Sequence, residues 1–390
     1  MVFKKRYVPF YNPDITISDI VSCLGLKNSP EKLQYELQNF FGIHNVMLTG
    51  SGRCALKIAL QGLNVSKGDE VILPPFICPS VGDAVLEVGG IPVFGDNDLL
   101  SFNMSPESVE EAISDKTKAI VIAHIGGIPA RINKFTELSK KYNIPLIEDC
   151  AQSFGAKYDG VYTGLHGDLA FISFGISKNI NGIGGGALFS QRKPGFLRER
   201  ELPPSPVIST MKKYFMLFST PLLFGETSGI FFNDILSKIS KNRYEIDNFH
   251  DYCKNIQNIE AAIAFRKLHI FTETQKWRNE IATLYRDKLH GKVDFLSIEK
   301  RSEPTFLYFP LLLPDNIRVK AMKKKLSESG IQSKDKDEMR YFALWKHKKF
   351  ENYKHYGENV LDIDERYLLL PLGHTVEITN AICSEIIQNL

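Results

Sequence analysis

Three things are scarce in this sequence, and each scarcity excludes a class of protein. The six cysteines among 390 residues show no CxxC pair and no metal-ligand spacing, so we expect reduced, buried thiols and no metal site. The net charge is only +3, with lysines and arginines spread along the chain, which gives no nucleic-acid footprint. No uninterrupted apolar run reaches the ~18 residues of a membrane-spanning helix.

Length and composition favour a two-part cytoplasmic protein. Residues 1–6 are basic but are not followed by the apolar stretch of a secretory signal. Single cores stop growing near ~250–300 residues, so a chain of 390 residues predicts a large and a small domain. We place an N-terminal arm and the large domain in 1–250, with an apolar insertion at about 203–245. A linking helix and the small C-terminal domain follow in 251–390.

Short apolar runs alternate with helical patterns between residues 46 and 190. Such βαβ alternation implies right-handed crossovers and a mainly parallel sheet. Further along, 305–313 is expected to be a strand and 319–328 a helix. The pattern therefore predicts an α/β fold with a large, mainly parallel sheet and a smaller C-terminal α/β part.

Two of the apolar runs end in residues that carry chemistry. Asp149 falls at the carboxyl end of the strand expected at 143–147, and Lys178 lies just past the strand expected at 169–174. Taken singly, such an Asp is often a helix N-cap and a loop Lys a solvated charge. Together, 29 positions apart at strand ends where ligands collect, they suit pyridoxal 5'-phosphate (PLP). In such a site the Asp keeps the ring nitrogen protonated and the Lys binds the aldehyde.

A glycine turn links another expected strand, 46–49, to a helix through residue 63. The small residues Gly50, Ser51 and Gly52 would let backbone N–H groups approach a phosphate, which the helix dipole also favours. An ordinary tight turn has the same composition. Arg53, at the start of the helix, either pairs with that phosphate or is solvated.

Four motifs in order carry a family resemblance. They are 148–156 (EDCAQSFGA), 164–168 (GLHGD), 173–174 (SF) and 177–179 (SKN). The sequence closely resembles the sugar aminotransferases of the DegT/DnrJ/EryC1/StrS type, which are fold-type I PLP enzymes. The resemblance runs from about residue 10 to the C-terminus and is thin between about 190 and 245.

The resemblance implies roles for six residues. Lys178 would hold PLP covalently and act as the general acid–base, and Asp149 would face the pyridine nitrogen. Gln152 resembles the residue near the ring's O3′. Gly52, Arg53 and Ser173 would hold the phosphate; Arg53 stands where the family usually has Thr. His124, at a strand end, is expected to be structural.

Two positions depart from the family pattern. The aromatic residue that usually covers the PLP ring aligns with Cys78, while Phe76 lies two residues earlier, and either is a candidate. The Asn that usually reaches a neighbouring subunit's phosphate aligns with Cys253, with Asn255 nearby. The resemblance still implies a homodimer.

The function implied by the resemblance is transfer of an amino group to a keto-sugar, nucleotide-linked, from an amino-acid donor such as glutamate. The pathway would lead to a surface glycan or a secondary metabolite. The first alternative is a PLP-dependent sugar dehydratase of the same fold, but those relatives carry His where this chain has Lys178. The second is a non-catalytic PLP-binding regulator.

The apolar segment 214–232 is longer and less polar than the usual connection of the family. Lys212 and Lys213 precede it, and Lys238, Lys241 and Arg243 follow it. It is too interrupted by Pro and Gly to span a bilayer comfortably. It is expected either to pack at the dimer interface or over the active site, or to attach peripherally to the inner face of the membrane.

Overall fold

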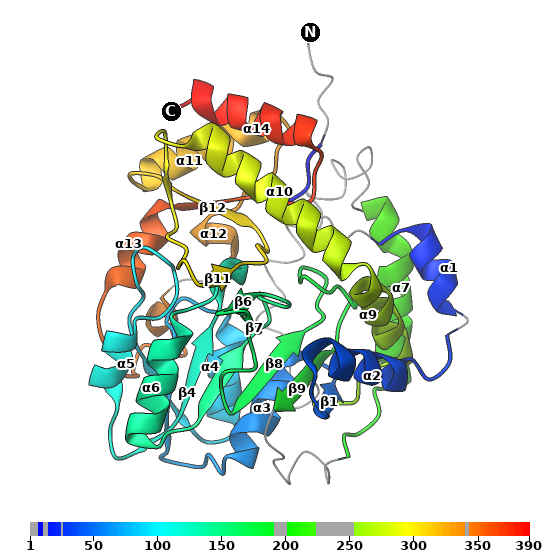
Figure 1. The fold of residues 1–390 in the computed structure, drawn as a ribbon, viewed down its shortest axis with the longest axis vertical. Coiled ribbons are helices and arrows are strands. Elements are labelled where there is room, and N and C mark those ends of the chain that lie inside the picture. Colours follow the sequence, from blue (N-terminus) through cyan, green and yellow to red (C-terminus); the bar gives the residue numbers. More distant parts are fainter. Residues whose placement is uncertain (1–6, 11–14, 25, 191–200, 224–252, 340–342) are drawn as a thin grey trace.

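A computed structural model describes residues 7–10, 15–24, 26–190, 201–223, 253–339 and 343–390. Its first half alternates strands and helices, as the apolar pattern predicts (Figure 1). The strands are β1 (Asn45–Thr49), β2 (Glu70–Leu73), β3 (Ile91–Phe94), β4 (Thr117–Ala123), β5 (Leu146–Asp149), β6 (Lys157–Tyr158), β7 (Val161–Tyr162), β8 (Leu169–Ser173) and β9 (Gly186–Ser190). The helices are α1 (Ile17–Leu24), α2 (Ser29–Phe41), α3 (Gly52–Gly62), α4 (Pro79–Glu87), α5 (Pro106–Ala112) and α6 (Ile132–Tyr142).

A seven-stranded sheet forms the centre of the molecule, in the order β1-β9-β8-β5-β4-β2-β3. Only β9 runs antiparallel to its neighbours, β1 and β8; the other adjacent pairs are parallel. Strands β5 and β8 are hydrogen-bonded neighbours, with Asp149 opposite Phe171. Strand β5 ends in Asp149, and β8 is followed by the turn that contains Lys178. The carboxyl ends of these two strands therefore lie side by side.

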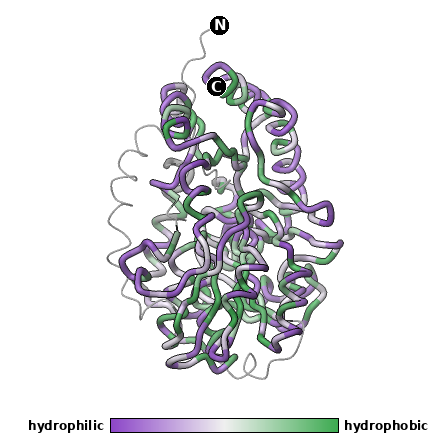
Figure 2. The backbone as a smooth tube through the Cα atoms, turned by 90° about the vertical axis from the view of Figure 1, so that its left-hand side faces the viewer, coloured by the Kyte–Doolittle hydropathy of each residue, from purple (hydrophilic) through white to green (hydrophobic). Residues whose placement is uncertain are grey.

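Both faces of this sheet are buried, which explains its almost continuous apolar strands. In β4, Val121 belongs to the core cluster that includes residues of α3 and α4. Its neighbours Ile120 and Ile122 belong to the cluster that contains Phe135 of α6. Figure 2 shows the hydrophobic stretches of the chain concentrated inside the molecule, with hydrophilic segments outside.

The second half of the chain builds a smaller three-stranded antiparallel sheet, β10-β12-β13, covered by helices. Its strands are β10 (Asp294–Phe295), β12 (Phe309–Leu312) and β13 (Tyr367–Leu370). The helices are α9 (Asn258–His269), α10 (Phe271–Leu289), α11 (Asn316–Glu328), α12 (Lys336–Met339), α13 (Asn359–Arg366) and α14 (Val376–Gln388). Strand β11 (Ser302–Glu303) pairs instead with β6 in a small third sheet. The predicted α/β fold is confirmed.

The predicted strand at 305–313 is wrong in its first four residues, because β12 begins only at Phe309. The N–H groups of Thr305 and Leu307 donate to the carbonyls of Gly127 and Gly126 instead of a strand partner. Phe306 has a φ of 30°, which breaks the extended conformation. This segment thus closes over the loop after β4.

Helix α7 (Val207–Leu223) occupies the first part of the expected apolar insertion. It contacts α1 and α9 at the edge of the molecule (Figure 1). Residues 224–252, and with them the rest of the insertion, lie outside the described residues. The domain boundary near residue 250 stays a prediction.

Candidate active site

A cavity of about 360 Å³ lies where β5 and β8 end and α3 begins. All six residues for which the sequence predicted a role line it: Gly52, Arg53, Asp149, Gln152, Ser173 and Lys178. They come from separate segments of the chain, and Gly52 and Arg53 lie 96 or more positions before the other four. The sheet unites them because parallel strands present their carboxyl ends on one edge.

Asp149 is the last residue of β5 and is buried. Its Oδ1 accepts a hydrogen bond from the Ala151 N–H at 2.9 Å. Burial raises the pKa of Asp149, while this hydrogen bond and the positive charge of Lys178 act in the opposite direction. A cationic group in the cavity would therefore favour the ionised carboxylate.

Lys178 lies in the turn that follows β8, where its N–H donates to the Gly175 carbonyl at 3.0 Å. The chain then doubles back, and the N–H groups of Gly182 and Gly184 donate to the Phe174 carbonyl. A Cβ on Gly182 would lie 2.9 Å from the Glu260 carbonyl oxygen of α9. The glycines after Lys178 let this loop pack directly against α9.

The N-terminus of α3 forms the other wall. The Ser51 Oγ caps the helix by accepting from the Cys54 N–H at 3.1 Å, while the first N–H groups of a helix have no partner within it. A Cβ on Gly52 would lie 3.1 Å from the Ser173 Cβ, so glycine allows this close approach to β8. Arg53 is half-buried beside them. Such a helix end favours an anion.

Gln152 is held by two donors. Its Oε1 accepts from the Gly126 N–H at 2.9 Å and from the Tyr308 Oη at 2.8 Å. These bonds fix the orientation of the amide and leave its NH₂ group as the donor end. Tyr308 was not identified from the sequence, since nothing in its local pattern links it to a residue 156 positions away.

The structure distinguishes the two candidates for the face of the cofactor ring. Cys78 lines the cavity, and its Sγ lies 3.1 Å from the Ser80 Oγ. Phe76 is buried instead in an aromatic cluster, with its ring centroid 5.4 Å from those of Phe102 and Tyr367. The thiol, rather than the aromatic ring, borders the cavity.

Cys253 and Asn255 are the candidates for the residue that reaches a neighbouring subunit's phosphate. Neither is among the described residues that line this cavity. The Asn255 Nδ2 donates to the Leu202 carbonyl at 2.8 Å, so its amide is engaged locally. Cys253 is partly exposed. A contact from either residue to a neighbouring subunit stays a prediction.

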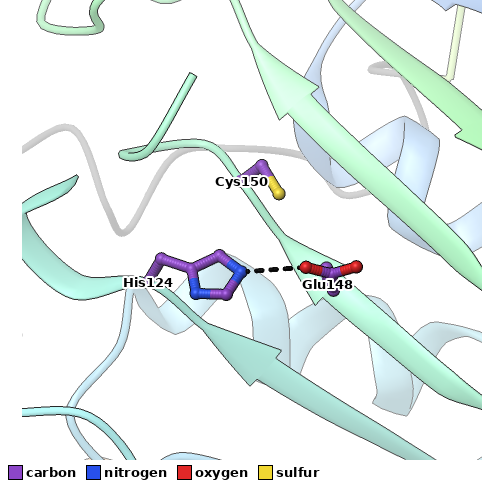
Figure 3. Close-up of side chains that lie close together, drawn as sticks. All are labelled: His124, Glu148 and Cys150. Carbon is purple, nitrogen blue, oxygen red and sulfur yellow. Dashed lines mark hydrogen bonds and ion pairs between the residues drawn. The ribbon is translucent and has the colours of Figure 1, made fainter. Parts of the chain in front are cut away.

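His124, Glu148 and Cys150 form a buried cluster, with their potential ligand atoms within 4.8 Å of one another (Figure 3). The His124 Nδ1 accepts from the Ala130 N–H, which leaves the ring proton on Nε2 to donate to Glu148 at 3.1 Å. Burial raises the pKa of Cys150 well above its usual range, whereas a metal needs a thiolate. Both ring nitrogens of His124 are hydrogen-bonded, which fits the structural role expected from the sequence.

Glu148 organises the GLHGD loop. Its carboxylate accepts from the N–H groups of Gly164, His166 and Gly167 at 2.6–2.8 Å, besides His124. Burial by itself raises the pKa of Glu148, but the hydrogen bond from His124, the charge of His166 and the Gly164 N–H hold it below its ordinary value of 4.5. The loop, and Asp149 beside it, depend on an ionised Glu148.

We expect Glu148→Gln to destabilise the protein. Whichever way the amide turns, its NH₂ faces N–H donors, and a buried unsatisfied group costs about 1–3 kcal/mol. Chemical denaturation should therefore give a free energy of unfolding lower by about 2 kcal/mol or more. Glu303→Gln, at an exposed carboxylate 3.9 Å from Lys157, is the matched control and should leave it unchanged.

The same variant tests the pH dependence. Because the folded pKa of Glu148 is lowered, its carboxylate contributes stability above pH 4.5 that is lost as the pH falls through the folded value. The Glu148→Gln variant should therefore lose less stability than the wild type when the pH is lowered through this range. Equal stability of wild type and variant at neutral pH would contradict the assignment.

Comparison with known proteins places the chain in a family. The profile of the DegT/DnrJ/EryC1/StrS aminotransferase family matches residues 24–197 and 232–390. GDP-perosamine synthase of Escherichia coli O157:H7 is 34% identical over 197 residues, which are 48% of this chain and 54% of the relative. UDP-N-acetyl-3-dehydro-alpha-D-glucosamine 3-aminotransferase of Acidithiobacillus ferrooxidans is 38% identical over 163 residues, 42% and 44% of the two chains. The chain thus matches about half the length of these relatives.

Solved structures agree over the whole chain. The aminotransferase TlmJ of Streptoalloteichus hindustanus superposes with a TM-score of 0.77 at 20% identity, covering 98% of both chains. A DegT DnrJ EryC1 StrS aminotransferase from Brucella abortus gives 0.73 at 23% identity, covering 95% of this chain and 93% of that one. At such identities these two structures establish the fold. Together with the profile match, they lead to one conclusion: the chain belongs to the DegT/DnrJ/EryC1/StrS aminotransferase family.

Proposed function

We propose that the protein is a PLP-dependent aminotransferase that converts a nucleotide-linked keto-sugar to an amino-sugar with an amino-acid donor such as glutamate. The observation that carries the proposal is the single cavity that unites Lys178, Asp149 and the N-terminus of α3. The two relatives reported above are named for GDP- and UDP-linked sugars, which supports the substrate class. A place in surface-glycan or secondary-metabolite synthesis follows from such products.

The residues around the cavity fit PLP. Its volume, about 360 Å³, lies within the range of small-ligand pockets. The buried carboxyl group of Asp149 suits a protonated ring nitrogen, because a cationic ring beside it would favour its ionised form. The α3 N-terminus, approached closely because Gly52 lacks a Cβ, suits a phosphate.

The chain's own residues divide the work as follows. Lys178 Nζ would hold the cofactor by condensing with its aldehyde, with loss of water, and, once an amino donor has displaced it, the free Lys178 amine would accept the proton from the donor's Cα. Asp149 holds the proton on the ring nitrogen, and the Gln152 NH₂ donates to the ring oxygen. Bound PLP supplies an electron sink for the bond that breaks. Ser173, Gly52 and Arg53 hold the phosphate.

The test is a half-reaction. Glutamate added to the PLP-loaded protein should bleach the visible absorbance of the cofactor, and a nucleotide keto-sugar should restore it. A panel of such sugars would identify the substrate and the carbon that is aminated. Unchanged absorbance with every amino donor would instead favour the non-catalytic regulator. Loss of a sugar hydroxyl without transfer of nitrogen would favour the dehydratase.

We expect a homodimer, because sites in this family are built at subunit interfaces. Sedimentation of the PLP-loaded protein should give twice the mass of the 44.2 kDa chain. Measuring activity across the same concentrations completes the test. A monomer that turned over substrate at full rate would contradict the expectation.

We further propose a cytoplasmic protein, at the inner face of the membrane. Within the described residues, no helix has the length and apolarity that crossing a bilayer needs. Of the apolar segment 214–232, only 214–223 lies in the described part of the chain.

A further inference from the structure

Helix α7 carries a stripe of exposed apolar side chains. Ile208, Met211, Phe215 and Phe218 are 67%, 66%, 77% and 51% exposed. Their spacing of three, four and three residues places them on one side of the helix. The stripe begins at Ile208, six residues before the apolar segment 214–232 that was predicted from the sequence. The exposed apolar surface is therefore a feature of helix α7 as a whole.

The opposite side of α7 is anchored to the body of the protein. Leu217 is fully buried in a cluster with Ile183 and with Ile259 and Ile263 of α9. The Lys213 Nζ lies 3.1 Å from a carboxylate oxygen of Glu260 and donates to the Ile183 carbonyl at 2.7 Å. Helix α7 lies at the edge of the molecule beside α1 and α9 (Figure 1). Its exposed stripe lies on a different side of the helix from Leu217 and Lys213, and in the described part of the chain none of the stripe residues lines the active-site cavity.

The charge around the stripe favours an anionic partner. Residues 202–225 contain no Asp or Glu, and their only charged side chains are Lys212 and Lys213. Lys213 is paired with Glu260, while Lys212 is exposed. A second copy stacked on the same face would bring two Lys212 side chains together without an acid from this helix to separate them. An anionic lipid surface attracts such residues.

The size of the stripe points the same way. With about 200 Å² for each aromatic side chain, Phe215 and Phe218 expose roughly 250 Å², and the smaller Ile208 and Met211 bring the stripe to somewhat less than roughly 500 Å². That is below the ~800 Å² per partner of a standard protein interface. It is sufficient for a helix that lies in a membrane interface, with its apolar face ~5–10 Å below the headgroups.

We propose that the outer face of α7 docks on an anionic lipid bilayer. Ile208, Met211, Phe215 and Phe218 enter the boundary between headgroups and acyl chains, and Lys212 stays among the headgroups. This docking goes beyond the amino-transfer chemistry and does not depend on it, because binding is measured without substrate. It holds the active site at the membrane surface, where a lipid-linked acceptor or a membrane-bound partner enzyme would meet the product.

Co-sedimentation of the full, PLP-loaded chain with vesicles tests the proposal. Wild type should pellet with vesicles of equal parts phosphatidylglycerol and phosphatidylcholine, and less with phosphatidylcholine alone. The double variant Phe215→Asp/Phe218→Asp should bind at least about tenfold more weakly. Ile317→Asp, at a 79% exposed position of α11, is the matched control and should bind as wild type does.

Lys212→Glu provides a second, independent arm. It leaves the apolar stripe intact, so binding to the anionic vesicles should fall while the weaker binding to phosphatidylcholine persists. All these side chains are exposed, and unchanged cofactor absorbance checks that each variant is folded.

Three outcomes would overturn the proposal. They are no pelleting of the wild type with anionic vesicles, equal pelleting of the wild type and the stripe variant, and equal loss in Ile317→Asp. A fourth is a stripe variant that sediments as a smaller assembly than wild type in the absence of lipid, because a second copy would then be the occupant of the stripe.

Discussion

Lys178→Ala should bind PLP without covalent attachment and should have no measurable transaminase activity. The amine is needed twice, to bind the aldehyde carbon and to move the Cα proton. General acid–base catalysis alone contributes up to about 10⁴-fold, so the rate should fall by at least about 10⁴-fold. The measurements are borohydride reduction followed by peptide mass mapping, together with a turnover assay.

Two further variants sharpen this result. Lys178→Arg retains the positive charge that acts on Asp149 but has no amine able to bond the aldehyde, so it should be as inactive as the alanine variant. Lys134→Ala removes an exposed lysine paired with Glu137 on α6 and should behave as wild type. If reduction attached the cofactor to another lysine, the assignment of Lys178 would be wrong.

Asp149→Asn should retain PLP but lose activity by several orders of magnitude. Asn keeps the oxygen that accepts from the Ala151 N–H, so the local structure is preserved. It cannot hold the ring proton by charge, and each unit of lost pKa corresponds to ~1.4 kcal/mol, or tenfold. A fall of about three units in the ring nitrogen's pKa would give a loss on the order of 10³-fold.

The same Asp149→Asn substitution, which lowers activity, should not lower the stability of the cofactor-free protein. Because burial raises the pKa of Asp149, its ionised form opposes folding when no cofactor is bound. Cofactor-free Asp149→Asn should therefore unfold, near neutral pH, at the same or a higher denaturant concentration than the cofactor-free wild type. Asp159→Asn, at an exposed residue paired with Arg301, is the control for both readouts. A near-normal rate in Asp149→Asn would remove this residue from the mechanism.

The sequence by itself determined the fold class and the family, and the six residues to which it assigned roles are among those that line the cavity; the roles themselves stay predictions. The parallel sheet was predictable because its strands are buried on both faces and therefore appear as short apolar runs. Asp149 and Lys178 were predictable because each directly follows such a run, so that the order of strands places them on one edge. The Gly52 turn was recognisable for the same local reason.

Only the tertiary structure decided the contacts between distant segments. Whether Phe76 or Cys78 borders the cavity depended on an aromatic cluster formed with Phe102 and Tyr367. The shortened β12 resulted from backbone bonds to Gly126 and Gly127, and Tyr308 reached Gln152 across 156 residues.

Helix α7 illustrates the same limit. Its composition revealed an apolar segment, but apolar composition is equally compatible with burial and with exposure. The Lys213–Glu260 pair and buried Leu217 fix which side faces the protein and leave Phe215 and Phe218 outside. Periodicity reports which residues share a side of an element, and packing against other elements decides which side is covered.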